Sequence, residues 1–132
     1  MAVVLDTHTA IWYFSGSSQL SPTALNAIEG AISAAEDVFL SAISLVEVLY
    51  LAEKGKLPVD AVKKLDDALR EENSSIAIVP LDSAVARAVA QISRNAVPDM
   101  PDRIIAATAA HLGVPLVTRD RQIQASGIKT IW

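Results

Sequence analysis

The chain has 132 residues and a formal net charge of −4; 52% of its residues are hydrophobic, and none is cysteine. This length and composition predict one compact domain over residues 1–132, and they exclude disulfides and thiolate metal sites, so that any metal must be held by oxygen or imidazole ligands. No apolar run approaches the roughly 18 to 20 residues that cross a bilayer, and the N-terminus lacks the pattern of a signal peptide, so we expect a cytoplasmic protein without a membrane segment.

The first half of the chain alternates short apolar runs with segments of helical spacing. The predicted order is strand Ala2–Leu5, helix Thr7–Phe14, helix Ser21–Ser33, strand Asp37–Ser41, helix Ala42–Lys56 and helix Pro58–Glu72. Ser21 followed by Pro22 is typical of an N-cap and the first turn of a helix, and Gly55 is expected to end the helix that begins at Ala42.

The second half continues this alternation. The predicted order is strand Ile76–Leu81, helix Asp82–Ile92, helix Asp102–Leu112, strand Val114–Thr118, a helical turn over 119–125 and strand Ile128–Trp132. Strands that are continuous apolar runs and alternate with helices predict a three-layer α/β/α sandwich with a mostly parallel central sheet. Right-handed crossovers bring the carboxyl ends of such strands to one edge, and ligands bind outside that edge.

Acidic residues stand where several of these strands end and helices begin. Asp6 directly follows the first strand, Asp120 follows the fourth strand, and Asp102 stands at the start of a helix with Asp99 three residues before it. Each of them could be an ordinary N-cap, and Asp82, which follows the third strand in the same way, is interpreted as a plain N-cap. Two carboxylates so close to one helix start are, however, more than capping needs.

Glu47 is harder to explain as a structural residue. It lies in the segment "AISLVEVLYLA", which is apolar on nearly every face and is therefore expected to be buried all round. An unpaired carboxylate there would cost on the order of several kcal/mol unless a cation or hydrogen-bond donors met it. The alternatives are a salt bridge to an arginine in the core, or a protonated carboxyl group.

Carboxylates gathered at one site repel one another, so they should either bind protons with raised, coupled pKa values or bind a divalent metal. Ligands that are all oxygen suit Mg²⁺ or Mn²⁺, and such ions can activate a water and orient it toward a phosphodiester. The acids therefore fit metal-dependent phosphodiester hydrolysis. The net charge of −4 argues against a protein that coats nucleic acid but permits an enzyme that acts on it.

Four segments together resemble the PIN-domain ribonucleases and, within that family, the VapC toxins of type II toxin-antitoxin systems. They are "VVLDTHTAIW", "LSAISLVEVLYLAEKGKL", "DMPDRIIAATAAHLGVPLVTRD" and "IKTIW". The resemblance implies an endoribonuclease dependent on Mg²⁺ or Mn²⁺, whose metal ligands and catalytic residues are Asp6, Glu47, Asp102 and Asp120. It also implies an RNA substrate, a homodimer, and an antitoxin that wraps the toxin and often places a basic side chain against the acids.

The same resemblance implies auxiliary residues. Asp99 and Arg103 match a third motif of the form D-x-x-D-R, in which Asp99 shapes the start of the helix or orients water. Thr118 matches a position where the family often has a hydroxyl residue near the metal or substrate. For His8, beside the first acid, we expect a turn or hydrogen-bonding role rather than a catalytic one.

Residues for binding RNA are less well marked. A groove would have to be assembled from local basic residues: Arg119, Arg121, Lys54 and Lys56. The aromatic run Trp12, Tyr13 and Phe14 could stack on RNA bases, but we expect it to pack in the core or a dimer interface.

Two rival functions use the same acids differently. In the first, a non-catalytic module with this fold receives a basic partner peptide in its acidic pocket, although an inactive copy should have lost one or more of the four acids. In the second, a phospho-acceptor domain of the receiver type gathers aspartates around Mg²⁺. That type needs two adjacent acids after its first strand, where Asp6 stands alone.

Overall fold

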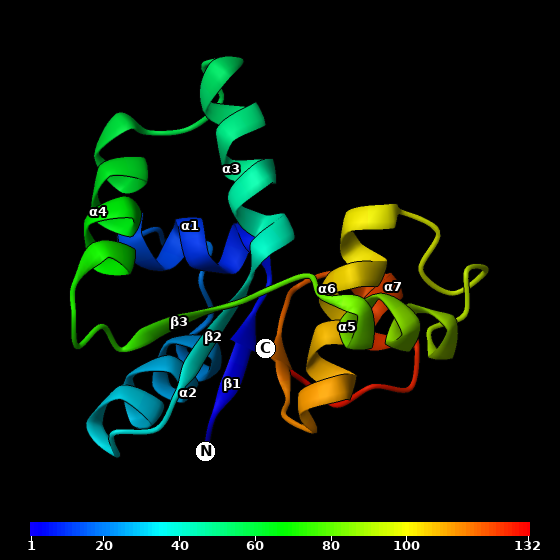
Figure 1. The fold of residues 1–132 in the computed structure, drawn as a ribbon. Helices are drawn as coiled ribbons and strands as arrows, with labels where there is room; N and C mark the ends of the chain where they lie inside the picture. Colours follow the sequence, from blue (N-terminus) through cyan, green and yellow to red (C-terminus); the bar gives the residue numbers. More distant parts are fainter.

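The computed structural model describes residues 1–132, and all the predicted strands and helices are present in it (Figure 1). In chain order the elements are β1 (Val3–Leu5), α1 (Thr7–Ser15), α2 (Pro22–Ser33), β2 (Val38–Ser41), α3 (Ala42–Glu53), α4 (Val59–Arg70), β3 (Ile76–Val79), α5 (Ser83–Ala88), the 3₁₀ helix η1 (Val89–Gln91), α6 (Met100–Leu112), β4 (Leu116–Val117), α7 (Arg121–Gln124) and β5 (Thr130–Ile131). The strands are shorter than the apolar runs that predicted them.

The five strands form one sheet in the order β3-β2-β1-β4-β5, and every neighbouring pair is parallel. From the central β1 the chain moves outward to β2 and β3, and then crosses to β4 and β5 on the other side. Leu5 at the end of β1 is in register with Val117 at the end of β4. The residues that follow these two strands therefore emerge side by side at the point where the strand order reverses, which is where open α/β sheets bind ligands.

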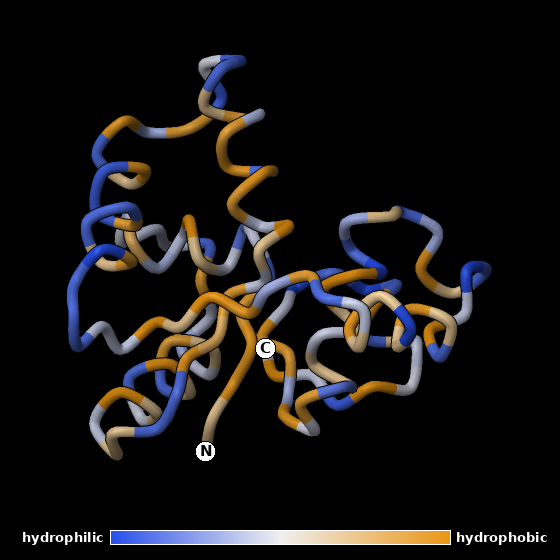
Figure 2. Tube along the Cα trace, viewed as in Figure 1, coloured by the Kyte–Doolittle hydropathy of each residue, from blue (hydrophilic) through white to orange (hydrophobic).

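Helices cover both faces of the sheet, because successive side chains of a strand point to opposite faces. Val3 and Leu5 belong to one core cluster, together with residues of α1, α2 and α4, whereas Val4 belongs to a second cluster with residues of α5, α6 and α7. Figure 2 shows the hydrophobic stretches along the strands at the centre of the molecule. The predicted α/β/α sandwich is confirmed, and its sheet is entirely parallel.

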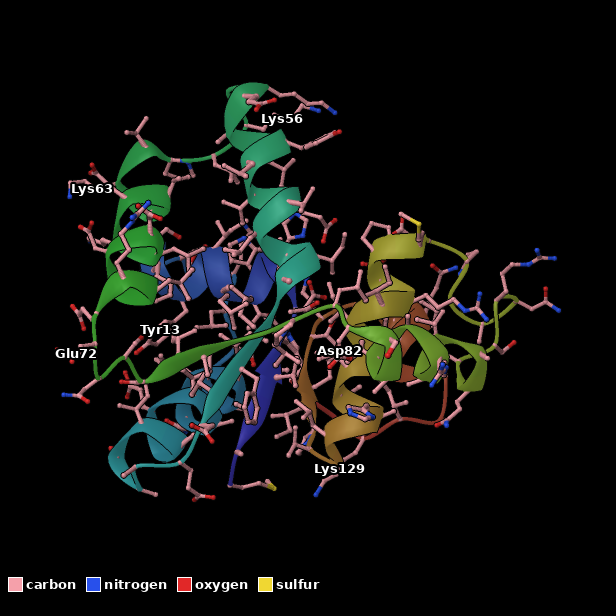
Figure 3. All side chains as sticks on the ribbon, in the orientation of Figure 1. Tyr13, Lys56, Lys63, Glu72, Asp82 and Lys129 are labelled. Atoms are coloured by element: carbon pink, nitrogen blue, oxygen red, sulfur yellow. The ribbon has the colours of Figure 1, made fainter.

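The helix caps follow the sequence signals. Ser21 accepts a hydrogen bond from the backbone N–H of Ala24, and Pro22 lies in the first turn of α2. Asp82, labelled in Figure 3, accepts a 3.0 Å hydrogen bond from the backbone N–H of Val85 and caps α5. Asp82 is therefore the plain N-cap that we predicted.

Helix α3 is not buried all round, and that prediction is wrong. Its only buried residues are Ser44 and Val48, whereas Val46, Leu49 and Tyr50 are 46%, 59% and 62% exposed. Figure 1 shows the reason: α3 extends away from the sheet, so its later turns reach beyond the layer that could cover them. An apolar groove of about 770 Å³ lies where α3 and α4 meet. No helix combines the length and the hydrophobicity needed to span a membrane.

Candidate active site

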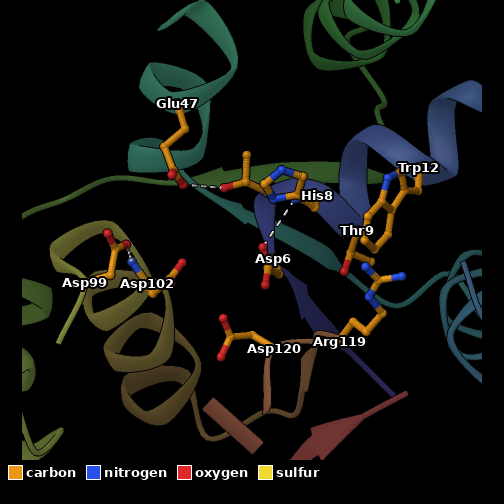
Figure 4. Close-up of a pocket in the computed structure, with 10 residues that line it drawn as sticks. Asp6, His8, Thr9, Trp12, Glu47, Asp99, Asp102, Arg119 and Asp120 are labelled. Atoms are coloured by element: carbon orange, nitrogen blue, oxygen red, sulfur yellow. Dashed lines mark hydrogen bonds between the residues drawn. The ribbon is translucent and has the colours of Figure 1, made fainter. Parts of the chain in front are cut away.

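A pocket of about 490 Å³ brings the predicted acids together (Figure 4). Its lining residues are Asp6, Thr7, His8, Thr9, Trp12, Glu47, Asp99, Asp102, Arg119 and Asp120. Half of these residues are carboxylates. The carboxylates come from the end of β1, from α3, from the start of α6 and from the loop after β4. All four predicted ligands and the auxiliary Asp99 therefore face one site, although they are spread over more than a hundred residues of the chain.

Asp6 combines a structural role with a place in the pocket. One carboxylate oxygen accepts a 3.2 Å hydrogen bond from the backbone N–H of His8 and so caps α1; the other accepts a 2.6 Å hydrogen bond from the Thr118 hydroxyl. Asp6 is only 7% exposed. Burial raises the pKa of its carboxyl group, and the hydrogen bonds from Thr118 and from the His8 backbone act in the opposite direction.

Thr118 joins the two strand ends that meet in the pocket. Its buried hydroxyl donates to Asp6 and accepts a 3.0 Å hydrogen bond from the backbone N–H of Asp120. The Asp120 carboxylate in turn accepts a hydrogen bond of 3.0 Å from the backbone N–H of Ile123 and caps α7. Asp6 and Asp120 thus both cap helices and line the pocket, so that capping does not compete with a role in the site.

Glu47 lies on the half-buried face of α3. Its Oε1 accepts a 2.7 Å hydrogen bond from the Thr7 hydroxyl, which is 2.9 Å from Ser44 Oγ. A hydroxyl carries one proton, so when Thr7 donates to Glu47, Ser44 must donate to Thr7. Burial raises the pKa of Glu47, Asp6 and Asp99 add to the rise, and the bond from Thr7 opposes it. The alternative of a salt bridge to arginine is excluded, since none of the ion pairs involves Glu47.

Asp99, and not Asp102, caps α6. The helix begins at Met100 rather than at Asp102 as predicted, and Asp99 Oδ2 accepts a 3.1 Å hydrogen bond from the backbone N–H of Asp102. The sequence carried a signal for this start, because Pro101 is favoured in the first turn and Asp99 stands three residues before an acid, as in a capping box. Asp102 is thereby free of the capping role, and its carboxylate accepts no hydrogen bond within the protein.

The carboxylates of the pocket repel one another. Burial, followed by repulsion from Asp99, Asp6, Asp120 and Glu47, raises the pKa of Asp102 from 3.8 to about 7. No ion pair in the protein includes any of these acids. Arg103, which follows Asp102 in the chain, makes no ion pair with them; its Nε donates a 2.8 Å hydrogen bond to the carbonyl of Ile92.

The donors suit a hard divalent cation in their chemistry, although they do not form a closed cage. No group of three or more His, Cys, Asp or Glu side chains stands in a metal-chelating arrangement. Mg²⁺ keeps several waters and is bound through only one or two carboxylates together with substrate phosphates. An open pocket lined by unpaired carboxylates is compatible with that mode of binding.

Comparison with known proteins identifies the family. Residues 3–128 match the family model of the PIN domain. The chain belongs to the PIN-domain family. A relative of this PIN-domain protein, Ribonuclease VapC22 of Mycobacterium tuberculosis (strain ATCC 25618 / H37Rv), is 35% identical over 125 residues, which are 93% of this chain and 90% of the relative. The resemblance inferred from the four sequence segments is confirmed.

Solved structures agree with this assignment. VapBC2 from Rickettsia felis, bound to a DNA fragment from its promoter, has a TM-score of 0.73 at 18% identity over 98% of this chain and 97% of the other. FitAcB from Neisseria gonorrhoeae has a TM-score of 0.61 at 28% identity over 97% and 95% of the two chains. The first of these likenesses shows a shared fold alone.

Sequence reasoning missed part of the pocket of this PIN-domain protein. The hydroxyl pair of Thr7 and Ser44 holds Glu47, yet only Ser44, one helical turn before Glu47, is close to it in the sequence. Trp12 was expected to pack in the core or a dimer interface; it is partly buried, contacts Trp132, and also lines the pocket. His8 makes the expected hydrogen bond, but through its backbone N–H.

Proposed function

We propose that this PIN-domain protein is a divalent-metal-dependent endoribonuclease and the toxin of a type II toxin-antitoxin pair. The observation that carries the proposal is the convergence of five carboxylates, from four separate parts of the fold, on one pocket that contains no ion pair. A relative of 35% identity named as a ribonuclease supports the reaction class. The substrate would be RNA, cut by hydrolysis of a phosphodiester bond.

Asp6, Glu47, Asp102 and Asp120 would hold the metal, which we propose to be Mg²⁺ or Mn²⁺. Their oxygens are the ligands that these ions prefer, and the repulsion that raises the pKa of Asp102 is the force that a cation would relieve. When bound, a divalent ion supplies a Lewis acid that lowers the pKa of water and stabilises the leaving oxygen.

The other polar residues of the site would fix the carboxylates in place. The Thr118 hydroxyl donates to one carboxylate oxygen of Asp6. The other oxygen accepts a hydrogen bond from the His8 backbone N–H, and the Asp6 carboxylate also lines the pocket. Thr7 holds one oxygen of Glu47 and leaves its second oxygen free. Asp99 fixes the start of α6 and hence the position of Asp102. Asp6 and Glu47 would therefore keep part of their coordinating capacity while their rotamers are restrained, and the Asp102 carboxylate, which accepts no hydrogen bond, would keep all of its own.

A protein partner is part of the proposal. Another solved structure of similar fold is a toxin-antitoxin complex from Klebsiella pneumoniae, with a TM-score of 0.64 at 19% identity over 98% of this chain and 96% of the other. We propose a cognate antitoxin and a homodimer for this chain too, acting in the cytoplasm. The exposed apolar residues of α3, Val46, Leu49 and Tyr50, together with the adjoining groove, support a protein interface.

RNA cleavage by matched variants tests the reaction. With Mn²⁺ present, Asp6→Asn, Glu47→Gln and Asp102→Asn should each abolish cleavage by the purified protein. Asp82→Asn is the control, because Asp82 is also a strand-end N-cap but lies outside the pocket, and asparagine caps about as well as aspartate. Cleavage that survives Asp102→Asn would refute the proposal. A protein that cleaves no RNA but binds a basic peptide through these acids would instead be a non-catalytic module.

A further inference from the structure

One wall of the pocket differs in chemistry from the rest. Trp12 is the only hydrophobic residue that lines the pocket, and Arg119 is the only lysine or arginine. Figure 4 shows these two side chains together on one side, whereas Glu47, Asp99 and Asp102 lie on the opposite side. The pocket therefore has an acidic end and an end that combines a cation with an aromatic ring.

Trp12 holds the Arg119 guanidinium in place. The guanidinium carbon lies 4.7 Å from the centroid of the Trp12 ring, within the range of a cation–π interaction. Trp12 is itself packed, since its ring centroid lies 5.7 Å from that of His8 and 5.9 Å from that of Trp132. The conformational entropy of the arginine side chain is thus reduced before any ligand arrives.

The donors of Arg119 are unused within the protein. Its guanidinium makes no ion pair and donates no hydrogen bond to another residue, although five carboxylates line the same pocket. The side chain is exposed. A guanidinium presents five N–H donors in a planar fork that matches the oxygens of a phosphate. This cation does not neutralise the acidic end, so it is available to an anionic ligand that reaches across the pocket.

We propose that Arg119, positioned by Trp12, binds a backbone phosphate of the RNA strand next to the phosphodiester that is cleaved. This inference rests on the proposed function, which places the reacting phosphate at the acidic end. Because the contact is made to phosphate, Arg119 contributes affinity and register without selecting a base. Trp12 acts through Arg119 and is a positioning residue.

Steady-state cleavage of two unstructured RNA oligonucleotides of unrelated sequence tests the subsite. Arg119→Gln should raise KM for both RNAs by roughly tenfold to a hundredfold, as expected for the loss of a charge-assisted hydrogen bond, and should leave kcat nearly unchanged. Arg94→Gln is the matched control: it makes the same change of charge at an exposed arginine that lies outside the pocket and makes no ion pair, and it should leave KM close to the wild-type value.

Trp12 variants separate positioning from charge. Trp12→Phe retains an aromatic face and should behave as the wild type, whereas Trp12→Leu should raise KM by roughly twofold to fivefold through loss of the cation–π contact. The dependence of binding on salt gives a second readout, measured by anisotropy of a fluorescein-labelled RNA in the inactive Asp102→Asn background. There, Arg119→Gln should reduce the slope of log K against log salt concentration by about 0.7, and Trp12→Leu should leave it unchanged because the charge remains.

Three results would overturn the inference. The first is an equal rise of KM in Arg119→Gln and Arg94→Gln. The second is a rise of KM in Arg119→Gln for only one of the two RNAs. The third is a lower Tm in Arg119→Gln with KM and the salt slope unchanged. Failure of the proposed function is distinguishable, since the wild type would then cleave neither RNA, and the salt slopes would still decide whether Arg119 binds phosphate.

Discussion

Removing the charge of Asp102 should stabilise the metal-free protein at neutral and alkaline pH. Its carboxylate accepts no hydrogen bond and is repelled by four neighbouring acids, which together with burial raises its pKa from 3.8 to about 7. Between pH 4 and pH 7 the folded state retains a proton that the unfolded state has lost. The free energy of unfolding therefore falls as the pH rises through this range, and the full penalty is present above pH 7.

The size of the effect follows from that pKa. A rise from 3.8 to about 7 corresponds to about 4 kcal/mol for a group that is shielded from solvent. Because Asp102 faces an open pocket, screening by water reduces this to on the order of 1–2 kcal/mol. Asparagine also gives up the favourable interaction of a first-turn acid with the helix N-terminus, about 0.3–1 kcal/mol. The net gain is about 1 kcal/mol, or roughly 3–5 °C in Tm for a chain of this size.

Thermal unfolding in chelator at pH 8 and at pH 4 is the assay. Asp102→Asn should unfold at a higher temperature than the wild type at pH 8 and at nearly the same temperature at pH 4. Adding Mn²⁺ should reverse the order at pH 8, because metal stabilises only a folded state that binds it. Asp82→Asn should have nearly the same Tm as the wild type under each of these conditions, including in Mn²⁺. An Asp102→Asn variant that is less stable than the wild type in chelator at pH 8 would refute the reasoning.

Three further predictions concern the residues around the acids. Thr118→Val should destabilise the protein by about 1–3 kcal/mol in urea unfolding, because the buried Asp6 loses its 2.6 Å donor, whereas Thr118→Ser should restore most of this; equal stability of both variants would contradict the role of the hydroxyl. Asp99→Ala should cost about 1 kcal/mol through loss of the α6 cap, and Asp99→Asn little; a large loss in Asp99→Asn would show that its charge matters to folding. Thr7→Val should increase the Mn²⁺ concentration needed for half-maximal cleavage, because Glu47 is no longer restrained, and an unchanged requirement would argue against this positioning role.

The fold could be predicted from sequence because its signals are local. Continuous apolar runs marked the strands, and the alternation with helices implied parallel pairing. What the sequence could not supply was the order of strands in the sheet. Asp6, Asp82 and Asp120 all follow strands and cap helices, yet only Asp6 and Asp120 line the pocket. The reason is that β1 and β4 are neighbours, whereas β3 lies at the edge of the sheet.

Glu47 lines the pocket as predicted, but the burial of α3 on every side, from which its role was inferred, is not found. An apolar helix was expected to be covered on every side, but hydrophobicity does not say what covers a helix, and α3 leaves Leu49 and Tyr50 exposed. The partners of Glu47 were also beyond prediction, because Thr7 is 40 residues away in the chain. The capping role of Asp99, in contrast, has a local signal in the sequence, because proline is favoured in the first turn of a helix and Pro101 lies in the first turn of α6.

The most direct test of the account is a titration of the wild type with Mn²⁺ in which RNA cleavage and Tm are measured in the same buffer. We predict no cleavage in chelator and a common half-saturating metal concentration for cleavage and thermal stabilisation, with both responses lost in Asp102→Asn and kept in Asp82→Asn. RNA cleavage that persists in chelator, or stabilisation by Mn²⁺ that Asp102→Asn leaves unchanged, would contradict the claim that these carboxylates form a metal-dependent nuclease site.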